Sequence, residues 1–161
     1  MFRFTNRDVW VGSQVRRFQI VDHPGATAIW AEQDGSVLLV EQYRPAARRY
    51  MLELPGGTVE IGEEPMETAR REFEGETGYI PEDLTALGHI YPSPGYTTEV
   101  MYIFKAKGLR PGTQNLDPGE DLRIRWLSLE ELHTMVANGE IHDAKTLVAY
   151  YMCFAELSHQ S

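Results

Sequence analysis

The stretch Gly57–Tyr79, GTVEIGEEPMETARREFEGETGY, opens with a glycine-rich turn and continues as a predicted helix. Proline at position 65 suits the first helical turn, where the N–H that it lacks would have no partner. An apolar stripe follows at helical spacing, formed by Met66, Ala69, Phe73 and Thr77. We therefore expect a helix that begins near Pro65.

Two glutamates of this predicted helix, Glu72 and Glu76, are one helical turn apart, so their carboxylates lie on one face. Two carboxylates held together repel each other, and a cation between them removes the repulsion. Oxygen ligands of this kind suit a hard ion such as Mg²⁺ or Mn²⁺. The alternative interpretation is a solvated acidic helix without a metal.

The spacing of the fixed residues favours the metal site. Five residues separate Gly57 from Glu63, seven more precede Arg71 and Glu72, and the stretch ends with Phe73, Glu76, Gly78 and Tyr79. This pattern resembles the Nudix box of the Nudix hydrolase family, G-x5-E-x7-R-E-U-x-E-E-x-G-U, in which U is bulky and apolar. One position departs from the box, because Gly75 stands where the box has a glutamate. The resemblance implies an α+β fold, an α/β/α sandwich with a mixed β-sheet.

The composition is that of an ordinary globular domain. The chain of 161 residues is 42% apolar and 24% charged, and we expect residues 1–161 to form one domain with the box at 57–79. A formal charge of −9 argues against a general nucleic-acid binder or a binder of anionic membranes. Small phosphorylated ligands stay compatible with this charge, because a bound cation reverses the local sign.

The rest of the chain predicts strands on both sides of the box and two helices after them. We expect strands at 26–31, 37–43, 51–54, 84–91, 100–106 and 122–127. Pro81 and the acidic residues that follow it are expected to break the box helix. Ser128 opens a helix with a capping-box pattern, and Asp143 is expected to cap the last helix.

Residues 1–22 predict a hairpin, with strands around Arg7–Trp10 and Val15–Phe18. A two-stranded piece is marginally stable alone, so it needs a sheet or a second subunit to lie on. The single cysteine, Cys153, suits a reducing cytoplasm, and no apolar run is long enough for a signal peptide or a membrane span. We therefore expect a cytoplasmic protein that does not enter a membrane.

Motifs outside the box narrow the resemblance to the ADP-ribose (nucleoside diphosphate sugar) pyrophosphatases. They are Glu41–Pro45, Leu52–Gly57, Pro94 within PSPGYTTE, and Asp143–Thr146. This branch implies hydrolysis of a nucleoside diphosphate sugar, and a homodimer in which the N-terminal strands complete the partner's pocket. Tyr96 stands close to a tyrosine of the dinucleoside polyphosphate hydrolases, so hydrolysis of those substrates or of modified nucleotides is a second possibility.

The resemblance also assigns roles to single residues. Glu72, Glu76 and the carbonyl of Gly56 are the expected metal ligands, and Arg71 is expected to pair with Glu63 and orient the helix. Glu120 matches the general base of the branch, Glu99 is the alternative base, and either is otherwise a surface carboxylate. Binding of the substrate is expected from Arg44, Glu53, Pro94, Gly95 and Glu99.

Gly75 leaves three interpretations open. Glu72 and Glu76 suffice for the metal, or an introduced change weakens catalysis, or the protein binds a nucleotide sugar without turning it over. Helix propensity does not explain the residue, because glycine in a helix costs roughly 0.5–1 kcal/mol relative to alanine. We favour a working or weakened enzyme, because the other box residues and Glu120 are present.

Overall fold

The structure is a computed structural model that describes residues 2–158, with side chains as far as Phe154. The elements follow in the order β1 (Arg3–Val11), β2 (Gln14–Asp22), β3 (Ala26–Gln33), β4 (Ser36–Arg44), β5 (Arg49–Glu53), α1 (Pro65–Thr77), β6 (Tyr79–Ile90), β7 (Met101–Pro111), β8 (Leu122–Ser128), α2 (Leu129–Ala137) and α3 (Ala144–Ser158). Among the described residues, no helix is both long and apolar enough to cross a membrane.

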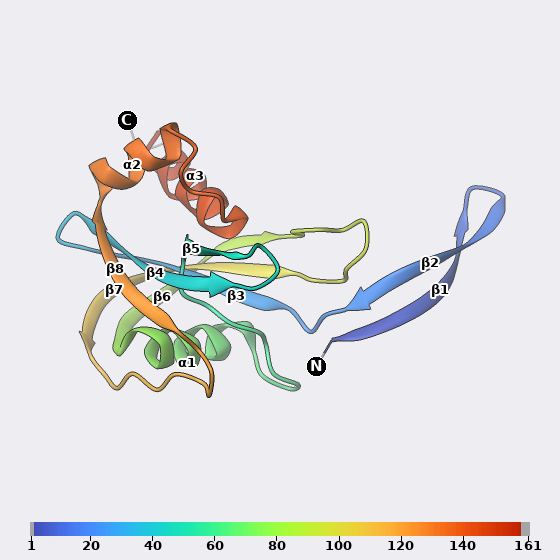
Figure 1. Cartoon of the computed structure of the whole chain (residues 1–161), viewed down its shortest axis with the longest axis horizontal. Helices are drawn as coiled ribbons and strands as arrows, with labels where there is room; N and C mark the ends of the chain where they lie inside the picture. The colour runs from blue at the N-terminus through green and yellow to red at the C-terminus, as the bar shows by residue number, and fades with distance from the viewer. Residues whose placement is uncertain (1, 159–161) are drawn as a thin grey trace.

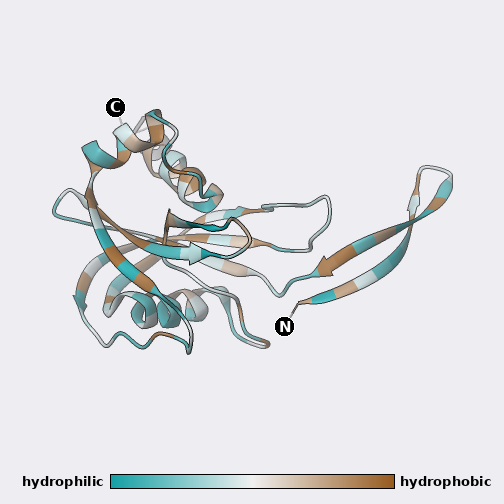
Figure 2. Cartoon of the chain, viewed as in Figure 1, coloured by the Kyte–Doolittle hydropathy of each residue, from teal (hydrophilic) through white to brown (hydrophobic). Residues whose placement is uncertain are grey.

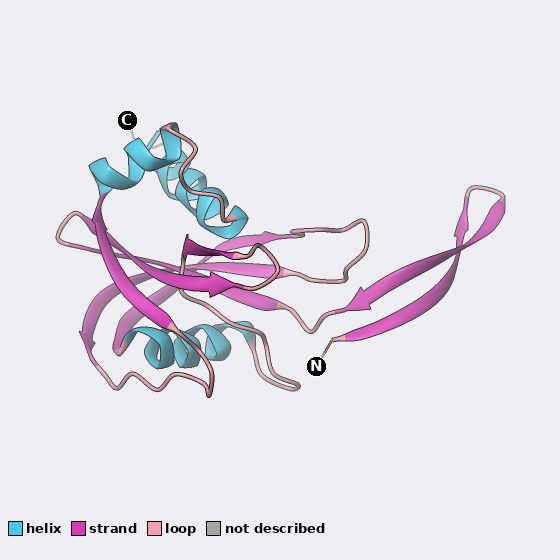
Figure 3. Ribbon diagram, in the orientation of Figure 1, coloured by secondary structure: helices cyan, strands magenta, loops and turns pink. Residues whose placement is uncertain are grey.

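A mixed sheet forms the middle layer of the main body. Its strand order is β5-β4-β3-β7-β6, with β8 paired to β4 on the other edge of that strand. The pair β3–β7 is parallel, whereas β4–β5, β4–β8 and β6–β7 are antiparallel. Helix α1 covers one face of the sheet and α2 and α3 cover the other (Figures 1 and 3). The expected α+β fold with a mixed sheet is confirmed.

Alternation along the central strands explains the two-sided core. In β4, Val37 and Leu39 pack with the α2–α3 side, and Leu38 and Val40 pack with the α1 side. All four side chains are buried. Because successive side chains of a strand point to opposite faces, a strand that is apolar throughout needs a helix layer on each face.

Helix α1 begins at Pro65 as expected but ends earlier than Pro81. Gly78 takes the left-handed conformation at φ 71°, and its N–H donates to the carbonyl of Glu74 at 2.7 Å. This closes the helix, because glycine adopts that conformation without a steric penalty. Pro81 lies inside β6, which is an edge strand where a missing N–H is tolerated. The break expected at Pro81 was therefore wrong.

The predicted N-terminal hairpin is present and longer than expected, since β1 and β2 pair from Arg3↔Asp22 to Val11↔Gln14. It projects away from the main body as a separate two-stranded ribbon (Figure 1). Apolar bands occur along it (Figure 2), and Phe4 and Trp10 are 85% and 71% exposed. Within the described residues, its backbone joins the body at Val21, which exchanges hydrogen bonds with Tyr96 and Thr98.

Candidate active site

The turn before the box helix lies directly against the two glutamates of that helix. Gly56 donates its N–H to Glu76 Oε2 at 2.8 Å. A Cβ on Gly57 would lie 2.2 Å from Glu72 Cδ, so only glycine lets that carboxylate approach. A Cβ on Gly56 would lie 2.0 Å from the carbonyl oxygen of Thr27 in β3. The Pro-Gly-Gly stretch thus brings the backbone into close contact with both carboxylates.

Arg71 connects the turn of the box to its helix. Its Nε and Nη2 donate to the two oxygens of Glu63 at 2.9 and 2.8 Å, and its Nη1 donates to Glu72 Oε1 at 2.7 Å. Thr68 also donates to Glu63, at 2.7 Å. Hydrogen bonding to Arg71 lowers the pKa of Glu63 to about 2. The expected Arg71–Glu63 pair is present, and it holds Glu72 as well.

The loop 112–121 lies across the C-terminal end of α1. The N–H of Asn115 donates to the carbonyl of Gly75 at 2.8 Å, and Gln114 Nε2 donates to the carbonyl of Glu76 at 2.7 Å. These contacts satisfy carbonyls that a helix end leaves without partners. The loop carries Asp117 and Glu120, so its docking brings both carboxyl groups to the helix.

These segments enclose an acidic pocket of about 270 Å³. The residues that line the acidic pocket are Glu60, Arg71, Glu72, Gly75, Glu76, Asn115, Asp117 and Glu120. Glu120, which is 44 positions after Glu76 in the sequence, is therefore brought to Glu72 and Glu76 of the box helix. Gly75 lies in the wall of the same pocket.

The pocket raises the pKa of both helical glutamates. Burial raises the pKa of Glu76 to about 8, and the charges of Glu72 and Glu120 act in the same direction. Burial also raises the pKa of Glu72, assisted by Glu120 and Asp117 and opposed by Arg71. The ionised form of both carboxyl groups is therefore disfavoured in this pocket, and a bound cation would stabilise that form.

Arg44 and Glu53 form a pair beside the acidic pocket rather than inside it. Arg44 Nε and Nη2 donate to the two oxygens of Glu53 at 2.7 and 2.6 Å. Glu53 is almost completely buried, so its side chain faces Arg44 and not solvent. Arg44 is half-exposed. It lies near enough to Glu76 for the charge of Glu76 to help raise the pKa of Arg44.

The 92–99 segment, with Pro94, Gly95 and Glu99, does not line the acidic pocket of this chain. Glu99 Oε1 lies 3.8 Å from His23 Nε2, beside the foot of the N-terminal hairpin. The segment is joined to that foot, because Val21 donates to the Tyr96 carbonyl at 2.8 Å. Of the two candidate bases, the structure brings Glu120 to the helical glutamates and leaves Glu99 beside the hairpin.

The sequence profile of the NUDIX domain matches residues 21–150. The chain belongs to the Nudix family. It is a Nudix pyrophosphohydrolase similar to the ADP-ribose pyrophosphatases, as the resemblance implied. The ADP-ribose pyrophosphatase of Bacillus subtilis (strain 168) is 40% identical over 134 residues, which are 81% of this chain and 72% of that relative.

Two further matches extend the comparison. The methanol dehydrogenase activator of Bacillus methanolicus is 37% identical over 139 residues, 84% of this chain and 75% of the relative. A crystal structure described as an ADP compounds hydrolase superposes with a TM-score of 0.82 and covers 99% of this chain and 87% of its own. With 22% identity, that structure supports the Nudix fold alone.

Nudix proteins typically use a divalent metal, and the oxygen donors here fit one. Within residues 2–158, no group of three or more His, Cys, Asp or Glu side chains is arranged to hold an ion. Two carboxylates still suit Mg²⁺, which keeps several water ligands and takes one or two carboxylates from a protein. Glu72 and Glu76 would hold the ion. Gly56 contacts Glu76 through its N–H, and coordination by its carbonyl stays a prediction.

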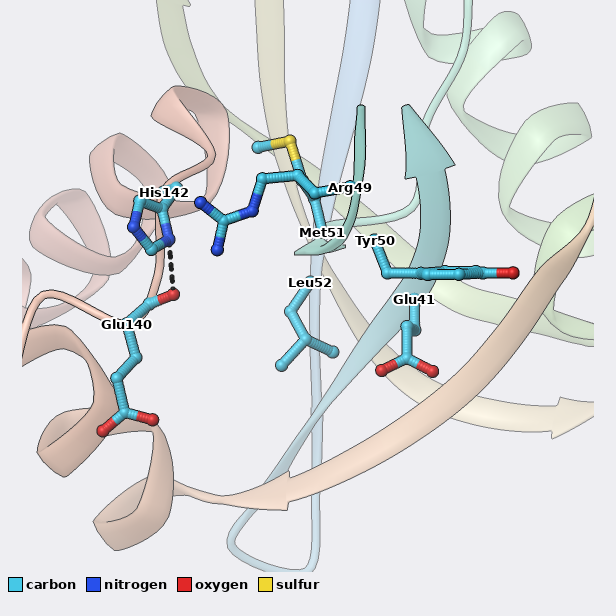
Figure 4. A pocket seen from close by; sticks show the side chains of 7 residues that line it. All are labelled: Glu41, Arg49, Tyr50, Met51, Leu52, Glu140 and His142. Atoms are coloured by element: carbon cyan, nitrogen blue, oxygen red, sulfur yellow. Dashed lines mark hydrogen bonds between the residues drawn. The ribbon is translucent and has the colours of Figure 1, made fainter. Parts of the chain in front are cut away.

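A second hollow, of about 150 Å³, lies along β5 and shares no lining residue with the acidic pocket. Figure 4 shows the Arg49 guanidinium pointing towards His142, with Leu52 and Glu41 on the other side. One contact relates this region to the Nudix site, because Tyr50 donates its hydroxyl proton to Asp121 Oδ2 at 3.2 Å. Since Asp121 follows Glu120, the β4–β5 hairpin helps to hold the loop of the candidate base.

Without a divalent metal, the thermal stability of the protein should fall as the pH rises. The folded pKa of Glu76, about 8, exceeds its ordinary value of 4.5, so the folded state binds more protons in this window. That contribution is complete below the unfolded pKa and is lost as the pH rises through the folded pKa. Melting temperatures in EDTA should therefore decline over this window in the wild type and decline less in Glu76→Gln. If the melting temperature fell equally with pH in the wild type and in Glu76→Gln, the raised pKa of Glu76 would be contradicted.

Gly75→Glu should improve the metal site. A Cβ at position 75 would lie 3.5 Å from the carbonyl oxygen of Asn115, an ordinary contact, so a side chain fits beside the acidic pocket. We expect the Mg²⁺ concentration that gives half-maximal activity to fall by roughly tenfold, the scale on which supporting groups alter metal affinity. Gly75→Gln is the matched control, since it adds the same bulk without charge. Equal effects of both variants would show that a third carboxylate is dispensable.

Proposed function

We propose that this protein hydrolyses the diphosphate bond of ADP-ribose or a related nucleoside diphosphate sugar, giving a nucleoside monophosphate and a sugar phosphate. The observation that carries the proposal is the acidic pocket, which joins Glu72 and Glu76 of the box helix to Glu120 of a distant loop. Similarity to an ADP-ribose pyrophosphatase at 40% identity supports the choice of substrate.

Each residue has a role that its surroundings support. When bound, Mg²⁺ or Mn²⁺ neutralises the diphosphate and lowers the pKa of the attacking water. Glu120 is the general base that accepts the proton of that water. Arg71 holds Glu72 in place through its pairing with Glu63. Arg44 offers guanidinium N–H groups to the diphosphate oxygens.

Glu53 then acts on the substrate through Arg44, because its own oxygens are buried against that side chain. Pro94, Gly95 and Glu99 belong to the substrate pocket only through a second subunit, since they lie beside the hairpin foot and away from the acidic pocket. We therefore assign them to the recognition of the base or the sugar across a dimer interface.

A second candidate function is favoured by Gly75, which removes one carboxylate from the box. In this case the protein binds a nucleotide sugar and turns it over slowly or not at all. A ligand-dependent rise in melting temperature without product would identify such a binding module.

A cytoplasmic location stays a prediction that rests on the single cysteine.

A metal-dependent substrate screen tests the proposal. Its members are ADP-ribose, ADP-glucose, GDP-mannose, diadenosine polyphosphates, NADH and oxidised dGTP, each with Mg²⁺, with Mn²⁺ and with EDTA. ADP-ribose or another nucleotide sugar should give the highest kcat/KM and only with metal. Preference for a nucleoside triphosphate with release of pyrophosphate would overturn the assignment.

The protein should be a homodimer formed through its N-terminal hairpin. Phe4 and Trp10 are strongly exposed on a ribbon that makes few contacts with its own body, and a two-stranded ribbon is marginally stable alone. Light scattering after size exclusion should give about twice the chain mass of 18.4 kDa. The double variant Phe4→Ser, Trp10→Ser should run as a monomer, and a monomeric wild type at micromolar concentration would contradict the proposal.

A further inference from the structure

Four charged side chains form a continuous chain that ends at Arg44. Arg44 donates hydrogen bonds to both oxygens of Glu53 at 2.7 and 2.6 Å. Lys145 donates to Glu53 Oε2, the oxygen that also accepts from Arg44 Nη2, and it donates to Asp143 Oδ1 at 3.0 Å. The order is therefore Asp143, Lys145, Glu53 and Arg44, with positive and negative charges alternating.

Of these four side chains, only that of Arg44, at the end beside the acidic pocket, is strongly exposed. The side chains of Glu53 and Lys145 are 3% and 12% exposed, whereas that of Arg44 is 43% exposed. A buried carboxylate needs compensating partners, because an unpaired buried charge is strongly destabilising. Burial pushes the pKa of Glu53 upwards, and Arg44 and Lys145 outweigh that effect, so its pKa lies below the ordinary value.

The fold fixes Lys145 at this place. Asp143 Oδ2 accepts from the N–H and the hydroxyl of Thr146 at 2.9 and 2.6 Å, which caps α3. The Thr146 hydroxyl oxygen in turn accepts the N–H of Leu54 at 2.9 Å. The first turn of α3, which carries Lys145, is thus bonded to the residue directly after Glu53.

We propose that Lys145 is a positioning residue that keeps Arg44 directed at the diphosphate of the substrate by holding Glu53 between two cations. The proposal rests on the proposed function of the site. With Lys145 present, the four side chains are balanced in charge; without it they carry a net negative charge beside Glu76, whose electrostatic interactions reach both Arg44 and Lys145. That charge would weaken the attraction for a diphosphate and loosen the Arg44–Glu53 geometry.

The test replaces Lys145 and follows ADP-ribose kinetics with Mg²⁺. Lys145→Met should raise KM by about tenfold and change kcat by less than about threefold, the signature of lost substrate positioning rather than lost chemistry. Lys145→Gln should show the same changes in KM and kcat. Because Gln retains a hydrogen-bond donor, this variant tests the proposal even if Lys145→Met folds poorly. Lys107→Met, an exposed lysine of β7, is the control and should keep the wild-type KM.

The pH profile separates this role from simple structural support. Arg44 of β4 and Lys145 of α3 lower the pKa of Glu53, Asp143 lies beside Lys145, and Glu76 of α1 interacts with both cations. Without Lys145 the pKa of Glu53 rises, so Glu53 is protonated at a higher pH. As the solution is acidified, the increase in KM should therefore begin at a higher pH in the variant than in the wild type. Lys145→Arg restores the charge and should restore the profile.

Wild-type KM and an unchanged pH profile in both neutral variants would overturn the proposal. If the wild type hydrolyses no nucleotide sugar, the proposed function fails, and the network is tested without substrate. The carboxyl carbon of Glu53, assigned by its loss in Glu53→Gln, is then titrated by NMR. An upward shift of its pKa in Lys145→Met supports the positioning of Glu53 by Lys145, and an unchanged pKa refutes it.

Discussion

Glu76→Gln should lower kcat/KM for ADP-ribose by at least about a hundredfold, because it removes a charged metal ligand from the acidic pocket. The loss should appear mainly in kcat at saturating substrate. Gln keeps the size of the side chain and can still accept the N–H of Gly56, so the fold should be preserved. The measurement is steady-state kinetics over a range of Mg²⁺ concentrations, with the melting temperature recorded in EDTA.

Glu74→Gln is the matched control, since Glu74 lies on the same helix and does not line the acidic pocket. Its Oε1 accepts the N–H of Thr113 at 3.4 Å, which an amide oxygen can also do. This variant should keep kcat/KM close to that of the wild type. A similar loss in both variants would mean that helix stability, rather than metal binding, is the sensitive property.

Glu120→Gln should lower kcat by about 10²- to 10³-fold and leave the Mg²⁺ requirement unchanged, as expected when a general base is removed but the metal ligands are kept. Glu120 lines the acidic pocket with Glu72 and Glu76, and its charge acts on both of them. Single-turnover kinetics with ADP-ribose would measure the chemical step directly.

Glu99→Gln separates the two candidate bases. Glu99 lies beside His23 at the foot of the hairpin, away from the acidic pocket of its own chain. We expect a change in KM without a comparable loss of kcat. A large loss of kcat in Glu99→Gln with a near-normal Glu120→Gln would reverse the assignment of the base.

The box and its helix could be predicted from the sequence, because local spacing determines both. The interval between Glu63 and Arg71 places the two groups within hydrogen-bonding distance once the helix forms. The end of the helix was misplaced because the left-handed conformation of Gly78 closes it before Pro81 is reached. Gly78 precedes Pro81 by three residues and by itself suffices to end the helix.

Long-range contacts limited the prediction of the rest of the site. Lys145 and Glu53 meet across 92 residues, and Lys145 was visible only as part of the Asp143–Thr146 motif, without a role. The docking of 112–121 depends on backbone bonds from Asn115 to the helix end, which no side-chain pattern records. The projecting hairpin was predicted from local alternation, but its separation from the body follows from which strands pair in the sheet.

The most direct test of this account is the hydrolysis of ADP-ribose by the wild-type protein with Mg²⁺, with Mn²⁺ and with EDTA, the products being separated by ion exchange. Equal amounts of AMP and ribose 5-phosphate are expected with a divalent metal, and no product is expected with EDTA. Ligand-dependent stabilisation without any product under the two metals would contradict it.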